Sequence, residues 1–270
     1  MDRKYNLPAK ISIAALFALR FLFLVIVPFF VPGKITIWIN DDLTYLFTGI
    51  FMLSIKNPDE FYLTKSFKLI FLAAPLLQLV IGLSIGQLKP FSFEKPIMAV
   101  VFSILFIIRG NLNFKSSGKV EVIRNVLFTL ALTATAVLLS AVSLAVQAKI
   151  ANTDIKENFS FPLILVNILA QINTAAISEE PLFRGIINSW LRKRFKNRVW
   201  VHVFSALSFT LAHIYYLDGR LISLFFVVPI GGIILSLIAE RTKSLTYTTF
   251  THGIINGTGN IIARLIYRLF

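Results

Sequence analysis

The chain lacks cysteine altogether and has few of the side chains that usually carry out acid–base chemistry: three histidines and 13 acidic residues among 270. The absence of cysteine excludes thiol catalysis, thiolate metal sites and disulfide bonds. The acids are outnumbered by 27 Lys and Arg residues, which gives a formal net charge of +14. In a soluble protein this surplus would favour nucleic-acid binding, but no basic domain stands apart from the apolar segments. We therefore expect no nucleic-acid partner.

Apolar residues are abundant instead: 56% of the chain is hydrophobic, 26 residues are Phe and the mean hydropathy is +0.77. Nine apolar runs follow one another, at about 11–31, 43–55, 69–88, 97–108, 122–148, 161–190, 199–217, 221–239 and 245–269. A helical span needs ~20 residues, and seven of these runs are long enough or nearly so. Because an open strand edge cannot face lipid, the spans are helices. The sequence predicts an all-α, polytopic membrane helical bundle with about seven to nine transmembrane helices.

Basic residues are distributed unevenly between the two sides of this predicted bundle. When every run is counted as a span, 17 Lys and Arg lie in the loops on one side and 6 on the other. The positive-inside rule then places the N-terminus and the loop 192–198 in the cytoplasm. The first run has no small-residue cleavage site before the Pro32-Gly33 break, so we expect a span rather than a signal peptide.

The recognisable motifs all lie in the second half of the chain. Residues 1–150 contain membrane helices without recognisable motifs, and residues 151–270 contain the motif-bearing helices. No long linker or low-complexity segment separates the two parts. We therefore expect a single membrane domain.

The first motif is an acidic pair inside the run 161–190, where Glu179 and Glu180 are followed by Pro181 and Arg184. A charge at bilayer depth costs ~3 kcal/mol or more, so such groups usually face a polar cavity and serve chemistry or transport. On a helix, Glu180 and Arg184 share a face and can pair, while Glu179 points ~100° away. Glu179 is then suited to act as a general base, although an ion pair that only locks two helices is the alternative. Pro181 predicts a kink about one turn back, near Ile177.

The second motif is Phe209-x-x-x-His213, whose two side chains share a helical face. Taken alone, a histidine on an apolar helix is more often a packed residue that is hydrogen-bonded to a neighbour. His202 lies next to the basic loop 192–198 and is expected at the surface or the membrane interface.

The third motif is His252-x-x-x-Asn256, again on one helical face. An imidazole and a carboxamide side by side can donate hydrogen bonds to a developing oxyanion, or they can simply clamp two helices together. Gly253 and Gly257 form a small-xxx-small pair that allows another helix to approach closely.

Together, two glutamates, two histidines and an asparagine are groups that can activate water against a carbonyl. In this order on late membrane helices, Glu-Glu-x-x-x-Arg, Phe-x-x-x-His and His-x-x-x-Asn resemble the motifs of the CPBP family. This CAAX-protease and bacteriocin-processing family, also called the ABI family, includes the type II CAAX prenyl proteases. The resemblance covers roughly residues 161–260.

The resemblance implies an intramembrane glutamate-type endopeptidase that hydrolyses a membrane-associated peptide or protein, in a bacterial cell membrane. It assigns water activation to Glu179 and His213, and the oxyanion hole to His252 and Asn256. The supporting residues that it implies are Glu180, Arg184 and Phe209.

Three alternatives stay open at this point. The chain could be a non-catalytic membrane scaffold or bacteriocin-immunity protein of the same family. It could also be a proton-coupled transporter, although no inverted repeat is visible. We expect no cofactor, with zinc as the alternative. Zinc needs three protein ligands and an open position, and its histidines need hydrogen-bond acceptors, of which few are expected because Glu180 should be committed to Arg184.

The predicted depths of the motif residues in the membrane fit the resemblance poorly. At ~1.5 Å per helical residue, Glu179 lies roughly 20 Å from the cytoplasmic Arg192, and His252 about 12 Å from its own cytoplasmic end. His213 lies only a few residues from the outer end of its run. These depths agree only if a helix is tilted or broken, or begins well inside the cytoplasmic surface.

Overall fold

The computed structural model describes residues 118–155, 161–217 and 220–269, together with Ile11, Ala14, Ala15 and Ala18. The chain divides into two compact units, 1–112 and 113–270, and the described ranges from residue 118 onward belong to the second. Its described ranges are helical and contain no strand, which confirms the all-α class there. The spans predicted before residue 118 lie outside the described residues, apart from those four positions.

The second unit begins with α5, Lys119–Ile150, a 32-residue apolar helix. One side of α5 carries small and polar side chains at helical spacing, all buried: Asn125, Thr129, Thr133, Ser140 and Ala141. This side packs against α11, and the hydroxyl groups of Thr133 and Thr251 lie 2.9 Å apart. Large apolar side chains such as Leu127 and Leu138 are exposed on its other side. That distribution is typical of a helix that faces protein on one side and lipid on the other.

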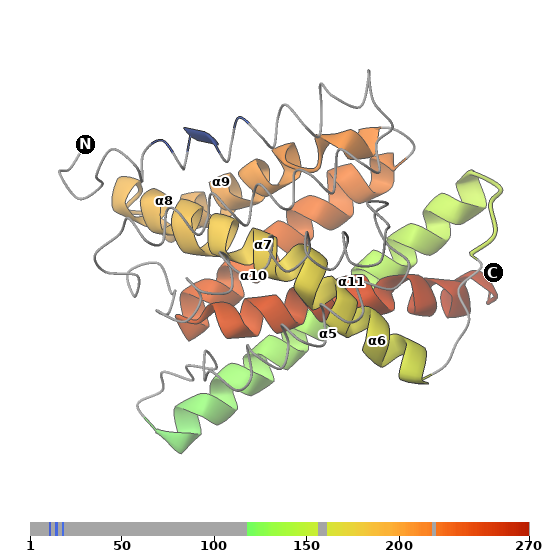
Figure 1. The fold of residues 1–270 in the computed structure, drawn as a ribbon, viewed down its shortest axis with the longest axis horizontal. Coiled ribbons are helices and arrows are strands. Elements are labelled where there is room, and N and C mark those ends of the chain that lie inside the picture. Colours follow the sequence, from blue (N-terminus) through green and yellow to red (C-terminus); the bar gives the residue numbers. More distant parts are fainter. Residues whose placement is uncertain are drawn as a thin grey trace, which may run out of the picture. The chain divides into compact units, whose positions relative to one another are not determined.

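The next helix is long and contains two π-helical segments. It consists of α6 (Phe161–Gln171), η4 (Ile172–Ala176), α7 (Ile177–Glu180), η5 (Pro181–Ile187) and α8 (Asn188–Arg194). Figure 1 shows these segments following one another as one rod.

Pro181 does not break this rod. Its backbone stays helical, at φ −61° and ψ −38°, and it begins the second π-helical segment. In a π-helical turn each N–H bonds to the carbonyl five residues earlier instead of four. The wider turn accommodates Pro181, which has no N–H to donate. The disturbance predicted near Ile177 therefore takes the form of wider turns on both sides of Glu179 and Glu180.

Two further helices form a closely packed hairpin. The first is α9, Arg198–Leu211, which the Asn197 side chain caps by accepting a hydrogen bond from the Val199 N–H. After the short 3-10 helix η6, Ile214–Leu217, the chain returns through the π-helical η7, Ser223–Val227, and α10, Val228–Thr242. A Cβ atom on Gly232 would lie 2.9 Å from the Ala206 Cα atom, so the two backbones nearly touch.

Because α9 ends at Leu211, His213 lies in the turn after α9 rather than on the helix.

The last helix, α11, spans Leu245–Tyr267 and packs against both α5 and α6. The Ser244 side chain caps it by accepting from the Thr246 N–H at 3.2 Å. A Cβ atom on Gly257 would lie 2.6 Å from the Ile168 backbone, and one on Gly253 would clash with the Ile172 side chain. The predicted role of this glycine pair in close helix packing is confirmed.

Two helices of the described ranges are long and apolar enough to cross a membrane: Lys119–Ile150 and Ser223–Thr242. By length and composition they are candidate membrane spans. The total of seven to nine spans remains a prediction.

Candidate active site

The acidic pair and Arg184 lie in the interior of the second unit. Arg184 Nη1 lies 3.3 Å from Glu180 Oε1, and both side chains are 0% exposed. The predicted i,i+4 pairing is thus observed, even though the turn between the two residues is π-helical. Glu179 is also buried, and it lies next to Glu180 on the four-residue α7.

His252 connects α11 to both glutamates. Its Nδ1 atom lies 2.8 Å from Glu180 Oε1, and its Nε2 atom lies 3.9 Å from Glu179 Oε2. A carboxylate only accepts hydrogen bonds, so we place the ring proton of His252 on Nδ1, which donates it to Glu180. In the neutral ring Nε2 then carries a lone pair, and it donates a hydrogen bond only in the imidazolium form.

His213 approaches Glu179 from the turn after α9. Its Nδ1 atom lies 2.9 Å from the Phe209 carbonyl oxygen, which again assigns the proton to Nδ1. Its Nε2 atom lies 3.8 Å from Glu179 Oε2. Both imidazoles therefore present Nε2 towards the same carboxylate oxygen. We call Glu179, Glu180, Arg184, His213 and His252 the inner cluster.

The Phe209 ring fills the space between the members of this cluster. The Arg184 guanidinium carbon lies 4.2 Å from the ring centroid, a cation–π distance. The imidazoles of His213 and His252 lie 4.5 and 6.0 Å from the same centroid. The Phe183 ring meets Phe209 edge-on at 5.0 Å. Phe209 thus supports both histidines and covers the buried cation.

Asn256 lies one turn beyond His252, as the motif predicts, and its side chain is exposed. Its Nδ2 atom donates to Gln171 Oε1 at 3.4 Å. Gln171 is the last residue of α6. The sequence did not single it out, because it is one polar residue at no distinctive spacing from the acidic pair.

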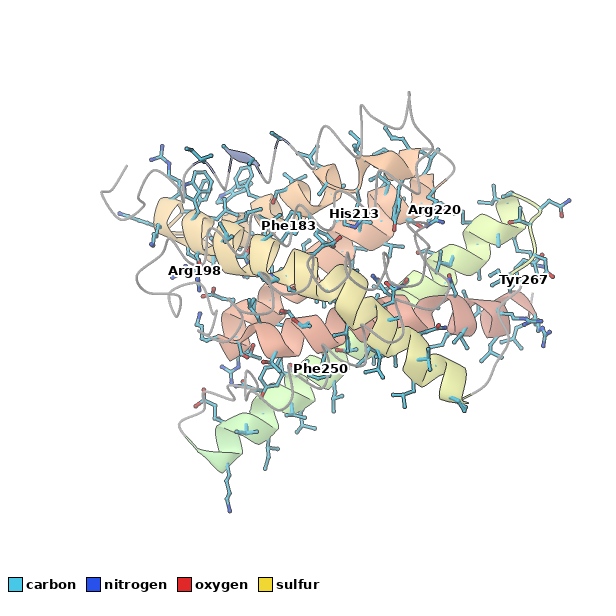
Figure 2. The ribbon with its side chains drawn as sticks, in the orientation of Figure 1. Phe183, Arg198, His213, Arg220, Phe250 and Tyr267 are labelled. Carbon is cyan, nitrogen blue, oxygen red and sulfur yellow. The ribbon has the colours of Figure 1, made fainter. Side chains whose placement is uncertain are left out.

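A pocket of about 240 Å³ lies beside the inner cluster. Both histidines, Phe209, Asn256 and Gln171 line it. Its wall continues past Tyr216, whose ring meets the His213 ring at 5.5 Å, to Arg220. Figure 2 shows His213 drawn between Phe183 and Arg220. Three of the four predicted catalytic residues, His213, His252 and Asn256, thus line one cavity, and the fourth, Glu179, lies within 3.9 Å of both histidines.

The motif residues meet in the structure although their predicted depths disagreed. Leu245 and Thr246 at the start of α11 are 1% and 2% exposed, whereas the side chain of Lys243, two residues earlier, is 51% exposed. α9 ends at Leu211, so His213 lies in the turn that follows it.

His202 is half-buried, and its Nδ1 atom lies 2.8 Å from the hydroxyl of the buried Ser236. That hydroxyl also accepts from Asn188 Nδ2 at 3.0 Å. Contacts with α8 and α10 keep this part of α9 from full exposure, and the predicted place of His202 at the membrane interface stays a prediction.

A second group of charges lies where α8, α9 and α10 meet the basic loop. Glu240 contacts three cations there: Lys243 at 2.8 Å, Arg192 at 3.4 Å and Arg198 at 4.0 Å. We call these four residues the outer cluster. The Glu240 side chain is 22% exposed and that of Arg198 is 55% exposed.

The described residues contain no group of three or more His, Asp or Glu arranged to hold a metal ion. The expectation that few hydrogen-bond acceptors are available to the histidines is nevertheless wrong. Glu180 Oε1 forms an ion pair with Arg184 and also accepts from His252 Nδ1, and the Phe209 carbonyl accepts from His213 Nδ1. Each imidazole thus already has the outer partner that a zinc-bound histidine requires. The donor set suits zinc chemically.

Comparison with known proteins places this half of the chain. Residues 161–258 match the family model described as type II CAAX prenyl endopeptidase Rce1-like. The match confirms the predicted family resemblance, and it begins and ends close to the limits predicted from the motifs. No curated protein and no solved structure matches the chain significantly.

Proposed function

We propose that this membrane protein, whose C-terminal helices are of the Rce1-like endopeptidase type, hydrolyses a peptide bond of a membrane-associated peptide or protein with an activated water molecule. The match over residues 161–258 supports a protease of the CAAX type. The observation that carries the catalytic assignment is the convergence of Glu179 Oε2 with two imidazole nitrogens, at 3.8 and 3.9 Å, beside a pocket.

Glu179 is the proposed general base. The distance of 3.8 Å between its Oε2 atom and His213 Nε2 is too long for a direct hydrogen bond, and it suits two groups that act on the same water molecule. The Phe209 carbonyl holds His213 in the tautomer that leaves Nε2 as an acceptor. Glu179 then takes a proton from the water and passes it to the leaving amine.

His252 and Asn256 are the proposed oxyanion donors. Asn256 has two amide hydrogens, of which one is directed to Gln171 and the other is available to the pocket. His252 donates from Nε2 when it is an imidazolium, while its Nδ1 atom is hydrogen-bonded to Glu180 Oε1 at 2.8 Å. Arg184 and Phe209 keep Glu180 and both imidazoles in position.

The first test replaces Glu179 with glutamine, which keeps the shape of the side chain and removes its basicity. A general base contributes about 10²- to 10⁴-fold, so we expect processing to fall by at least about 100-fold at equal membrane levels. Membrane-associated peptides would be compared by mass spectrometry between cells with wild type, Glu179→Gln and, as a control, Glu240→Gln. Undiminished processing by Glu179→Gln would refute the assignment and favour a non-catalytic scaffold.

The proposed reaction uses no metal, with zinc as the second candidate because both imidazoles have outer partners. The purified enzyme should keep its activity after treatment with EDTA and phenanthroline, with metal content measured in parallel. Activity that is lost on chelation and returns with stoichiometric zinc would contradict the metal-free reaction. Glu179 would then be a zinc ligand, or the base that acts on a zinc-bound water.

We also propose a bacterial cell membrane as the location, with a cytoplasmic N-terminus. The bias of 17 to 6 in loop charges supports this orientation. It places the outer cluster on the cytoplasmic side and Arg220 on the opposite side.

A further inference from the structure

Arg220 is the part of the pocket wall that the proposed reaction does not use. Among the described residues that line the pocket, it is the one with a permanent charge, and none of them is acidic. The other lining side chains are mostly apolar or neutral, such as Leu144, Val227 and Leu235. A positive charge in an otherwise neutral binding pocket attracts an anionic group of whatever occupies it.

The backbone and the side chain of Arg220 both have defined positions. Its N–H donates to the Tyr216 carbonyl and its own carbonyl accepts from the Leu224 N–H, each at 2.9 Å. Its guanidinium carbon lies 5.3 Å from the centroid of the Tyr216 ring, which in turn meets His213. Stacking on an aromatic ring leaves the planar donors at the edge of the guanidinium available for a carboxylate. Tyr216 therefore joins the cation to the proposed catalytic histidine.

We propose that Arg220 is a specificity residue that binds a carboxylate of the peptide substrate, an inference that rests on the proposed function. An extended peptide advances about 3.3 Å per residue. Tyr216 lies between Arg220 and His213, at 5.3 Å from the first and 5.5 Å from the second. A substrate carboxylate at Arg220 therefore lies within about three residues of the bond that is cleaved near His213. The carboxylate comes either from an acidic side chain or from the end of the substrate chain.

The test uses the purified full-length protein and synthetic apolar peptides in which a single Glu or Gln is moved along one sequence. Each peptide is made with a C-terminal acid and with a C-terminal amide, and cleavage positions are mapped by mass spectrometry. Because Arg220 is exposed, the expected preference for the carboxylate is about five-fold in kcat/KM, at a constant spacing from the cleaved bond. A preference for Glu over Gln identifies a side-chain carboxylate, and a preference for acid over amide identifies the chain end.

Variants separate the cation from the catalytic groups. Arg220→Gln should remove the preference while the neutral peptides are still cleaved, and Arg220→Lys should retain most of it. Arg198→Gln, which changes an exposed arginine of the outer cluster, should leave the preference intact. A wild type that treats acidic and neutral peptides alike, or a preference that survives Arg220→Gln, would overturn the proposal.

Binding to the Glu179→Gln protein keeps this proposal distinct from the proposed reaction. Anisotropy of fluorescent Glu and Gln peptides should show the same discrimination, again dependent on Arg220. If this discrimination is found but the wild type cleaves no peptide, the hydrolase assignment fails and the carboxylate site stands. If cleavage occurs but binding does not depend on Arg220, the carboxylate site is refuted.

Discussion

The inner and outer clusters contain the same kinds of ion pair in very different surroundings. Arg184 lies 3.3 Å from Glu180 and Arg192 lies 3.4 Å from Glu240, so the distances hardly differ. The first pair is 0% exposed, whereas the side chains of the second are 15% and 22% exposed. Two charges interact far more strongly in a low dielectric than in water, and removing one of them leaves a buried charge unsatisfied. The comparison teaches that burial, and not separation, decides what each pair does.

The two clusters also differ in how their contacts are shared among their residues. In the outer cluster three cations contact one carboxylate, so Glu240 keeps two partners when one cation is lost. In the inner cluster Glu180 forms an ion pair with Arg184 and accepts a hydrogen bond from His252. The Phe209 ring contacts both Arg184 and His252. A change to one inner residue therefore affects several others.

The strongest way to test this difference is to remove Glu180. Glu180→Ala leaves Arg184 buried without its carboxylate and should destabilise the protein by about 3–5 kcal/mol. Unfolding in detergent, or abundance in the membrane, measures the effect. Adding Arg184→Met should restore part of the stability, because the unpaired charge is then gone. A Glu180→Ala protein as stable as wild type would break the comparison.

A second change tests the close packing of α11 against α6. A methyl group on Gly257 would lie 2.6 Å from the backbone of Ile168, so Gly257→Ala should force α11 away from α6 and cost about 1–3 kcal/mol. The separation should also weaken the contact between Asn256 and Gln171 and lower activity. Gly231→Ala is the matched control, since nothing lies within 4 Å of the added carbon. Equal stability of the two variants would contradict the close approach.

The smallest effect is expected in the outer cluster. Glu240→Ala removes the carboxylate that contacts three cations, yet exposed ion pairs contribute only about 0–1 kcal/mol. We expect a loss of stability under about 1 kcal/mol that shrinks further as salt is added. A loss as large as that of Glu180→Ala would show that the outer charges are as important as the buried ones.

The sequence predicted which residues lie together within each motif, because the motifs are local. Glu180 with Arg184, Phe209 with His213 and His252 with Asn256 are each four residues apart, and helix geometry alone puts such residues on one face. The partner of His252 could not be predicted in this way, since Glu180 lies 72 residues away in the chain. Gln171 and the contact of His202 with Ser236 were missed for the same reason: their partners lie on other helices.

The sequence by itself determined the helical class of the described part, the family resemblance and the residues of the three motifs. These follow from apolar runs and from spacing along single helices, which depend only on the covalent order of residues. Only the tertiary structure decided that α9 ends before His213 and that Glu179 Oε2 lies within 3.9 Å of two imidazole nitrogens. It also decided that Tyr216 and Arg220 share the pocket with both of these imidazoles. Such contacts depend on how deeply each helix lies and how closely its neighbours approach, and that is set by packing between helices, as at Gly257, rather than by the order of residues within one.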